Sequence, residues 1–298
     1  MVSTKLPSTN SIVKKSNVLC RASWAPEAIW EARLVALVAT KINADDNDFK
    51  TYEVKVSEII NKKDTGGSQY EIIDKTTDYS MSRILRIKEK NGWAKYNIFS
   101  SCKYNSEKGS ISVSFHPDLK PHYLQLKERF TKYNLQQFLL LPSTYSQRLY
   151  EILKSWDDQP EIVISIEDFH QMLDVPESLK KDYTNFRRRV LEKAHKDIHK
   201  HTSLKYDWET SEPPKQGRKV KAIRFIFSEH RRQAAGIEKK QANSQRNNRL
   251  FVTAVRCREE HPNGCKHDNK PAVCKMCEGH TAAPLRSGER ERGYSSNP

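Results

Sequence analysis

Two hydrophobic patterns alternate along most of the chain. Segments such as "IWEARLVALVATKI" repeat apolar residues every three or four positions, as in a helix with one buried face. Others, such as "YEVKV", alternate apolar and polar residues, which is typical of a short strand. Paired strand segments separated by turn residues, such as "LKYDWE" and "VKAIRFIFS", predict β-hairpins. The pattern therefore predicts an α+β protein.

The predicted elements occur twice in the same order: helix, strand, helix, turn, helix, hairpin. The third helix is predicted over "TTDYSMSRILRIKEKNG" in the first copy and over "LKKDYTNFRRRVLEKAHKDIHKHT" in the second. "FTKYNLQQFLLLPSTYSQRLYEILKSW" is predicted to be mostly helical. A helix-turn-helix followed by a hairpin is a winged helix, which docks its third helix in the DNA major groove. We predict two tandem winged-helix domains.

This layout divides the chain into four predicted regions. Residues 1–22 are polar and expected to be a loose N-terminus. Residues 23–132 are the first winged-helix domain, for dimerisation and DNA binding, and residues 133–232 are the second, the main DNA reader. Residues 233–298 are a polar tail whose end, "SGERERGYSSNP", has the composition of a disordered segment.

A helical wheel sorts the residues of the second domain's third helix. Tyr183, Phe186, Val190, Leu191, Ala194 and Ile198 share one apolar arc, and Arg187 falls at its edge. The opposite arc is polar and consists of Lys181, Asn185, Arg188, Arg189, Glu192 and Lys196. Arginine can read guanine and asparagine can read adenine in the major groove, so these residues are candidate DNA contacts. The alternative is a solvated charged face.

Charge adds weight to the DNA interpretation. The chain has 298 residues with 52 Lys and Arg against 37 Asp and Glu, giving a formal net charge of +15. Its isoelectric point is near 9.4 and its mean hydropathy is −0.81. Such an excess indicates a polyanionic partner, although a basic protein without one is the alternative.

Two further cationic groups are weaker candidates for DNA contacts. In the first domain, the outward positions of the predicted third helix include Ser82, Arg83 and Arg86, for which an ordinary surface helix is the alternative. The second wing carries Lys215, Arg218, Lys219 and Lys221 around Gly217, for which a solubilising loop is the alternative. Wing cations would add salt-sensitive affinity for any duplex.

Four stretches together resemble a known family. They are "SISVSFHPDLKPHYLQLKERFTKYNLQQFLLL" leading into "SQRLYEILKSW", then "VISIEDFHQML", "YTNFRRRVLEKAHKDI" and "KQGRKVKAIRFIFS". They are similar to the iteron-binding plasmid replication initiator proteins, the theta-type family with tandem winged helices. The similarity spans roughly residues 10 to 232. The N-terminal domain matches less well, and the tail matches no pattern of this family.

The resemblance implies a non-catalytic, cytoplasmic, bacterial DNA-binding protein. A monomer would bind direct repeats, or iterons, in a plasmid origin, open an adjacent AT-rich region and recruit host initiator and helicase proteins. A homodimer in equilibrium with it would repress its own gene at an inverted repeat. The family's base-contacting arginines match Arg188 and Arg189 here. A transcriptional repressor without replication activity is the alternative.

The tail contains a candidate zinc site. Cys274 and Cys277 form a C-x-x-C pair, and Cys265 and His280 complete a possible set of four ligands. Cys257, His261 and His267 are further candidates, and the irregular spacing is not that of a standard zinc finger. No cofactor is expected to be required, and accidental cysteines in a disordered tail are the alternative.

Other functions are disfavoured by the sequence. A metal-dependent DNA-nicking enzyme would need His195, His199 and His201 beside a nucleophile such as Tyr183 or Tyr206, yet Tyr183 falls on the apolar arc. Paired carboxylates for its metal are not evident. No P-loop is found, and no apolar run reaches the roughly 20 residues of a membrane span. The unevenly spaced cysteines favour a reducing cytosol.

Overall fold

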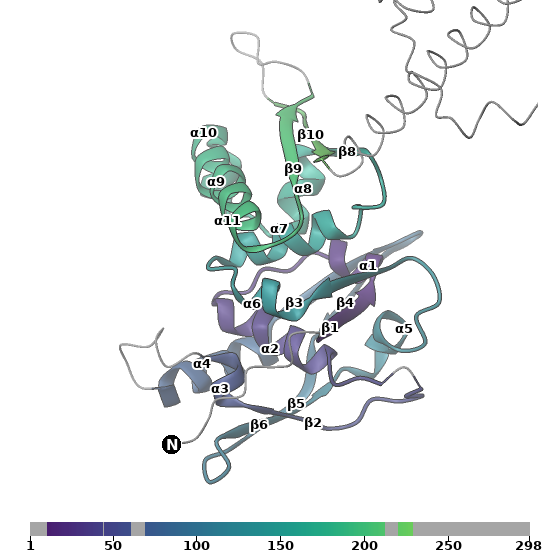
Figure 1. The fold of residues 1–298 in the computed structure, drawn as a ribbon, viewed down its shortest axis with the longest axis vertical. Coiled ribbons are helices and arrows are strands. Elements are labelled where there is room, and N and C mark those ends of the chain that lie inside the picture. Colours follow the sequence, from purple (N-terminus) through teal and green to yellow (C-terminus); the bar gives the residue numbers. More distant parts are fainter. Residues whose placement is uncertain (1–10, 44, 61–68, 212–219, 229–298) are drawn as a thin grey trace, which may run out of the picture. The chain divides into compact units, whose positions relative to one another are not determined.

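The structure, a computed structural model, describes residues 11–43, 45–60, 69–211 and 220–228, all within a compact unit spanning residues 1–231 (Figure 1). No helix in these ranges is both long and apolar enough to cross a membrane. The strands are β1 (Ile12–Ser16), β2 (Tyr52–Lys55), β3 (Ile84–Glu89), β4 (Gly92–Asn97), β5 (Phe99–Asn105), β6 (Ser110–Phe115), β7 (Phe130–Asn134), β8 (Glu161–Ser165), β9 (Tyr206–Thr210) and β10 (Ala222–Phe227). The helices are α1 (Asn17–Arg21), α2 (Ile29–Ala39), α3 (Val56–Ile59), α4 (Gln69–Ser82), η2 (Pro117–Leu119), α5 (Lys120–Tyr123), α6 (Leu135–Leu139), α7 (Thr144–Lys154), α8 (Ile166–Met172), α9 (Glu177–Lys180), α10 (Tyr183–Phe186), η3 (Arg187–Glu192) and α11 (Lys193–His201).

The same three-stranded antiparallel sheet occurs twice in this order of elements. The strand orders are β2–β6–β5 and β8–β10–β9, so in both sheets the last strand of the hairpin lies in the centre. Helices α2, α3 and α4 precede the hairpin of the first sheet, and α7, α8 and α10–α11 precede that of the second. The predicted pair of tandem winged-helix domains is confirmed.

The second domain shows how local sequence signals produce this fold. Strand β10 alternates strictly, with Ile223, Phe225 and Phe227 buried between less buried neighbours. A period of two places these side chains on one face of the sheet. Ser165 ends β8 and caps α8, because its Oγ accepts a hydrogen bond from the Asp168 backbone N at 3.0 Å.

The predicted third helix of the first domain is wrong beyond Ser82. Helix α4 ends there, and residues 84–97 form the antiparallel hairpin β3–β4. Leu85 and Ile87 are buried while Arg86 and Lys88 are more exposed, which is the period of a strand. The adjacent apolar residues at 84 and 85 fit a helical wheel equally well, so the pattern was ambiguous. Gly92, with a φ of +152°, lies at the hairpin turn instead of ending a helix.

The predicted loose N-terminus is also wrong for residues 12–22. Strand β1 pairs along its full length with β7, from Ile12 opposite Asn134 to Ser16 opposite Phe130. The side chains of Val13 and Cys20 are completely buried. Strand β7 replaces the start of the expected long helix, and the expected division at residues 132 and 133 falls inside it. Such pairing between distant segments leaves no local signal in the sequence.

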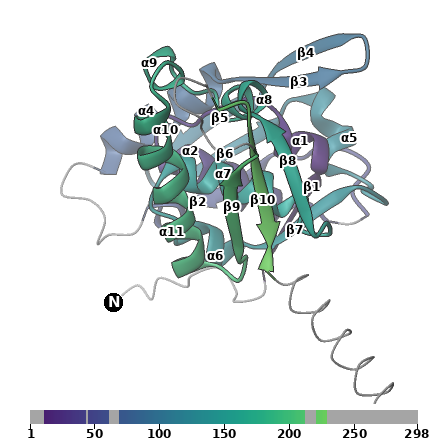
Figure 2. The same ribbon diagram turned by 90° about the horizontal axis from the view of Figure 1, so that it is seen from above.

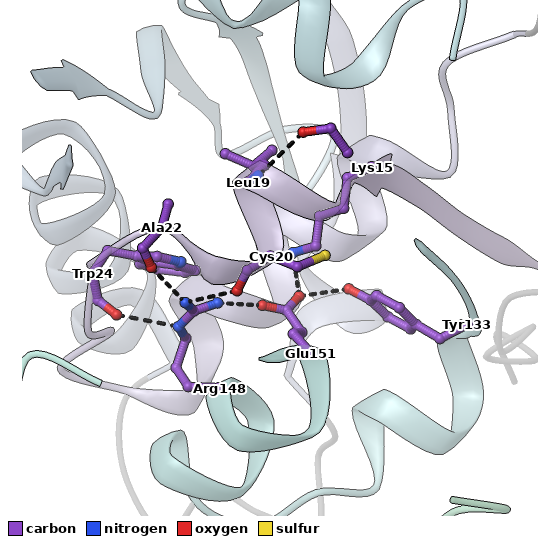
Figure 3. A network of polar contacts seen from close by, with 9 residues as sticks. Lys15, Leu19, Cys20, Ala22, Trp24, Tyr133, Arg148 and Glu151 are labelled. Atoms are coloured by element: carbon purple, nitrogen blue, oxygen red, sulfur yellow. Dashed lines mark hydrogen bonds and ion pairs between the residues drawn. The ribbon is translucent and has the colours of Figure 1, made fainter. Parts of the chain in front are cut away.

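A buried ionic network joins this N-terminal segment to helix α7 (Figure 3). The Glu151 carboxylate accepts hydrogen bonds from Lys15 Nζ, from Tyr133 Oη at 2.7 Å and from Arg148 Nη1 at 2.6 Å. Lys15, Arg148 and Glu151 are each at most 3% exposed at their side chains. The network therefore lies inside the hydrophobic core of the unit.

Arg148 also fixes the path of the chain between α1 and α2. Its Nη2 donates to the carbonyl oxygens of Cys20 at 3.2 Å and Ala22 at 2.8 Å, and its Nε donates to that of Trp24 at 3.1 Å. These carbonyl groups would otherwise be buried without partners, which costs free energy. One guanidinium thus satisfies a carboxylate, a carbonyl group in the last turn of α1 and the non-helical segment that follows.

Glu151 remains ionised in this setting. Burial by itself would raise its pKa, but the charges of Lys15 and Arg148 outweigh burial and lower the pKa below the usual 4.5. A carboxyl group with a lowered folded-state pKa stabilises the fold above its unfolded-state pKa, and this contribution is lost as the pH falls through the folded-state value.

We expect Glu151→Gln to lower the free energy of unfolding by about 3–5 kcal/mol at pH 7, because it leaves two buried cations without their counter-ion. Urea unfolding followed by circular dichroism measures this change. The deficit should shrink as the pH falls from the unfolded-state pKa through the lower folded-state pKa, where the wild-type carboxyl group also becomes protonated. Glu107→Gln, at an exposed turn residue, is the matched control. Equal stability of the two variants at pH 7 would contradict the assigned role of Glu151.

Candidate nucleic-acid interface

Helices α10, η3 and α11 follow one another without interruption over residues 183–201, and we call them together the recognition helix. Asp182 caps its start, because Asp182 Oδ1 accepts a hydrogen bond from the Asn185 backbone N at 3.0 Å. Figure 2 shows this helix lying alongside strands β9 and β10 of the second sheet. This is the third-helix position of a winged helix.

The buried face of the recognition helix agrees with the helical wheel. Phe186, Val190, Leu191, Ala194 and Ile198 are all completely buried. The Phe186 ring lies edge-on to Phe169 of α8, with centroids 6.0 Å apart, and Phe169 lies 5.5 Å from Phe225 of β10. These aromatic contacts join the recognition helix to α8, the second helix of its domain, and join α8 to the sheet.

The opposite face of the recognition helix is cationic, as predicted. Arg188, Arg189 and Lys196 are exposed on this face, and Lys181 is exposed just before the helix begins, after α9. Lys193 and Lys200 are exposed as well and were missed, although their positions on the wheel could have identified them. A dense row of cations on a helix in this position is the electrostatic signature of a surface that faces a polyanion.

Arg187, which the wheel placed at the edge of the apolar arc, is anchored locally. It is exposed, and its Nε donates to Glu192 Oε1 at 2.7 Å. Residues 187–192 form a π-helical turn, in which hydrogen bonds join residue i to i+5. Glu192 therefore neutralises the first of the three arginines.

The other two arginines differ from Arg187. Arg188 Nη2 donates to Asn185 Oδ1 at 3.0 Å, and the Asn185 amide donates in turn to Asp182. Asn185 is only half-buried, and it orients Arg188 without neutralising its charge. Arg189 forms no ion pair or hydrogen bond within the described ranges. Two guanidinium groups are thus available to an external acceptor.

The three candidates from the first domain do not share a helix face. Ser82 is the last residue of α4, and Arg86 belongs to β3. Arg83, between them, pairs with Glu27 Oε2 at 2.6 Å and lies 3.5 Å from Glu31 Oε2. Arg83 therefore links the end of α4 to the start of α2. The predicted set is corrected, because its members lie on different elements and one of them is neutralised.

Helix α4 occupies the third-helix position of the first domain but has an acidic surface. Its exposed side chains include Glu71, Asp74 and Asp78, against one lysine, Lys75. Carboxylates on this face would be repelled by phosphate groups. The two domains therefore present third helices of opposite charge.

Several predicted residues lie outside the described part of the chain. These are Lys215, Arg218 and Lys219 of the wing and the candidate zinc ligands Cys265, Cys274, Cys277 and His280. Lys221, at the base of the wing, is described and is exposed. On β10, Arg224 was not predicted as a candidate and pairs with Glu209 at 2.9 Å and with Glu161, so its charge is neutralised.

The histidine cluster has a structural role. His195 Nε2 and His199 Nε2 lie 3.0 and 2.8 Å from the Tyr206 carbonyl oxygen, which fastens the recognition helix to β9. Burial, followed by the nearby charge of His195, lowers the pKa of His199. The hydroxyl groups of Tyr183 and Tyr206 are both buried, and burial raises the pKa of each. Neither hydroxyl is accessible as the nucleophile of a nicking reaction.

Comparison with known proteins agrees with this geometry. The family description "Initiator Replication protein, WH1" matches residues 12–154, and "Initiator Rep protein, WH2" matches residues 165–227. The chain belongs to this family of plasmid-type initiator replication proteins. Both winged-helix units of the initiator family are therefore present, and the first unit includes β1 and α1.

Two individual relatives of this initiator have low sequence identity to it. The PI protein of Escherichia coli is 27% identical over 146 residues, which are 44% of this chain and 48% of that protein. The chain thus aligns with about half the length of this curated relative. A crystal structure of Pi initiator protein in complex with iteron DNA is similar with a TM-score of 0.58 and 17% identity, and the match covers 74% of this chain and 98% of that one. This second likeness supports the fold alone.

We expect Phe186→Ala to lower the free energy of unfolding by about 3–5 kcal/mol, because it empties a fully buried aromatic site under the recognition helix. Chemical denaturation gives this value, and Arg187→Ala, one residue further at an exposed position, is the control with little expected change. If the Phe186 variant were as stable as the control, the aromatic anchor of the recognition helix would be wrongly assigned.

Proposed function

We propose that this initiator binds duplex DNA at repeated sequences in a plasmid origin through the exposed face of the recognition helix. The proposal rests on one observation above all: the guanidinium groups of Arg188 and Arg189 are exposed and form no ion pair within the described ranges, on a helix whose opposite face is buried. The formal net charge of +15 favours a polyanionic partner. The complex of Pi initiator protein with iteron DNA suggests which kind of DNA to test.

The contacts would divide into readout and positioning. Arg188 and Arg189 would donate bidentate hydrogen bonds to guanine O6 and N7, and Asn185 would keep Arg188 extended before DNA arrives. Cations along the same face and at the wing would bind phosphate groups and set the register. These positioning residues are Lys181, Lys193, Lys196, Lys200, Lys215, Arg218, Lys219 and Lys221.

Activities beyond binding follow from the family and are part of the same proposal. Bound initiators would strain an adjacent AT-rich region until it opens, and would recruit host initiator and helicase proteins. A dimeric form would repress the initiator's own gene. None of these steps needs a catalytic group or a cofactor from the described residues. Zinc binding by the tail is a separate proposal. Elemental analysis of protein purified without a metal-affinity column would test it.

We expect the double variant Arg188→Ala, Arg189→Ala to lose at least tenfold of its preference for the cognate repeat over unrelated duplex, since a good bidentate pair discriminates by about 1–3 kcal/mol. Competition gel shifts at fixed salt measure this preference. Arg187→Ala is the matched control, because Glu192 already pairs with Arg187. Unchanged discrimination in the double variant would refute the role of these two arginines.

The whole proposal is tested on supercoiled plasmid carrying the region beside the initiator's own gene. We expect a periodic footprint over direct repeats and permanganate-reactive thymines in a neighbouring AT-rich segment. A footprint over an inverted repeat alone, with closed DNA, would instead identify a repressor. A covalent protein–DNA product would identify a nicking enzyme.

A further inference from the structure

The outer face of the β3–β4 hairpin has an unusual combination of side chains. Pairing of Arg86 with Lys95 and of Lys88 with Trp93 places all four on the same face of the two strands. The opposite face carries Leu85 and Ile87, which are buried in the core. The hairpin is therefore fixed to the domain through one face, and the other is left to solvent.

Trp93 is the central residue of this outer face. It is 53% exposed, which is a large apolar surface to leave in water. The Arg86 guanidinium lies 5.0 Å and the Lys95 ammonium 4.6 Å from the centroid of its ring. Such distances are those of cation–π contacts, which keep the indole and both cations close together.

The cations around Trp93 lack strong partners of their own. The side chains of Arg86 and Lys95 form no ion pair or hydrogen bond within the described ranges, and Lys88 Nζ lies 3.8 Å from Asp168 Oδ1 at exposed positions. The pair formed by Arg21 and Trp156 is different. Arg21 lies 3.7 Å from that ring and also donates to Ser155 Oγ at 2.8 Å, so it is held in place as part of the fold.

An exposed indole beside Arg86 and Lys95, neither of which forms an ion pair within the described ranges, matches the chemistry of unpaired nucleotides. An aromatic ring can stack on a base only when the face of that base is accessible, as it is in a single strand. A duplex would offer only its phosphate groups to the cations and would leave the indole exposed. Neighbouring cations can neutralise the phosphates on either side of the stacked base.

From this arrangement we infer that the outer face of the β3–β4 hairpin binds single-stranded DNA, with a base stacked on Trp93 and phosphates held by Arg86, Lys88 and Lys95. The inference deepens the proposed function, since an opened origin supplies such a strand. The acidic surface of α4 leaves this hairpin as the cationic part of the first domain's helix–hairpin segment at residues 69–97.

The test is equilibrium binding of the full chain to fluorescein-labelled dT20, measured by anisotropy. Trp93→Ala should weaken binding about tenfold, and Trp93→Tyr should retain most of the affinity, because stacking needs an aromatic ring. Lys95→Ala should reduce the slope of log affinity against log salt by about 0.7. The controls are Leu140→Ala, a similarly exposed apolar residue, and Lys103→Ala, an exposed lysine on β5.

A parallel measurement uses the duplex repeat. We expect Trp93→Ala to bind the duplex as tightly as wild-type protein, which also shows that the variant is folded. Wild-type affinity of this variant for dT20 would overturn the inference, as would equal losses for dT20 and the duplex. A change only in sedimentation would identify a protein interface and would also overturn it. If wild-type protein bound dT20 but no duplex repeat, the proposed function would fail while the hairpin site stood.

Discussion

The arrangement of the described unit depends on the buried ion pairs that the Glu151 carboxylate forms with Lys15 and Arg148. Isolated charges in a core are strongly unfavourable, so Glu151, Arg148 and Lys15 can be buried only together. Each cation also fixes the position of a chain segment. Lys15 belongs to β1, and Arg148 donates hydrogen bonds to the carbonyl groups that precede α2. A shift of any of these segments would leave a buried charge without a partner. The network therefore favours one alignment, whereas apolar packing alone tolerates several.

Helix α7 transmits this constraint to the second domain. It carries Arg148 and Glu151, and Ser146 on the same helix donates to Asp197 of the recognition helix at 2.6 Å. Phe186 packs the recognition helix against α8, and His199 joins it to β9. The exposed arginines thus project from a helix that is fixed at several points, and a rigid support preserves the geometry that base readout requires.

Sequence patterns predicted the second domain well and the first domain poorly. In the second, the Ser165 cap and the strict alternation in β10 are local signals that agree with one another. In the first, "ILRIKE" fits both periods, and only its pairing with β4 makes it a strand. Strand β1 pairs with a segment more than a hundred residues away, and the partner of Lys15 is Glu151. Non-local pairs of this kind cannot be derived from one sequence.

The different partners of the arginines explain why net charge alone cannot locate a binding site. Arg83 and Arg187 each pair with a carboxylate, and Arg148 is neutralised in the core. Each of these residues looks as cationic in the sequence as Arg188 or Arg86 does. Only the folded chain separates arginines whose charge is neutralised internally from those left for a ligand. The candidate DNA-binding arginines are therefore distinguished from the others because, within the described ranges, no carboxylate forms an ion pair with them.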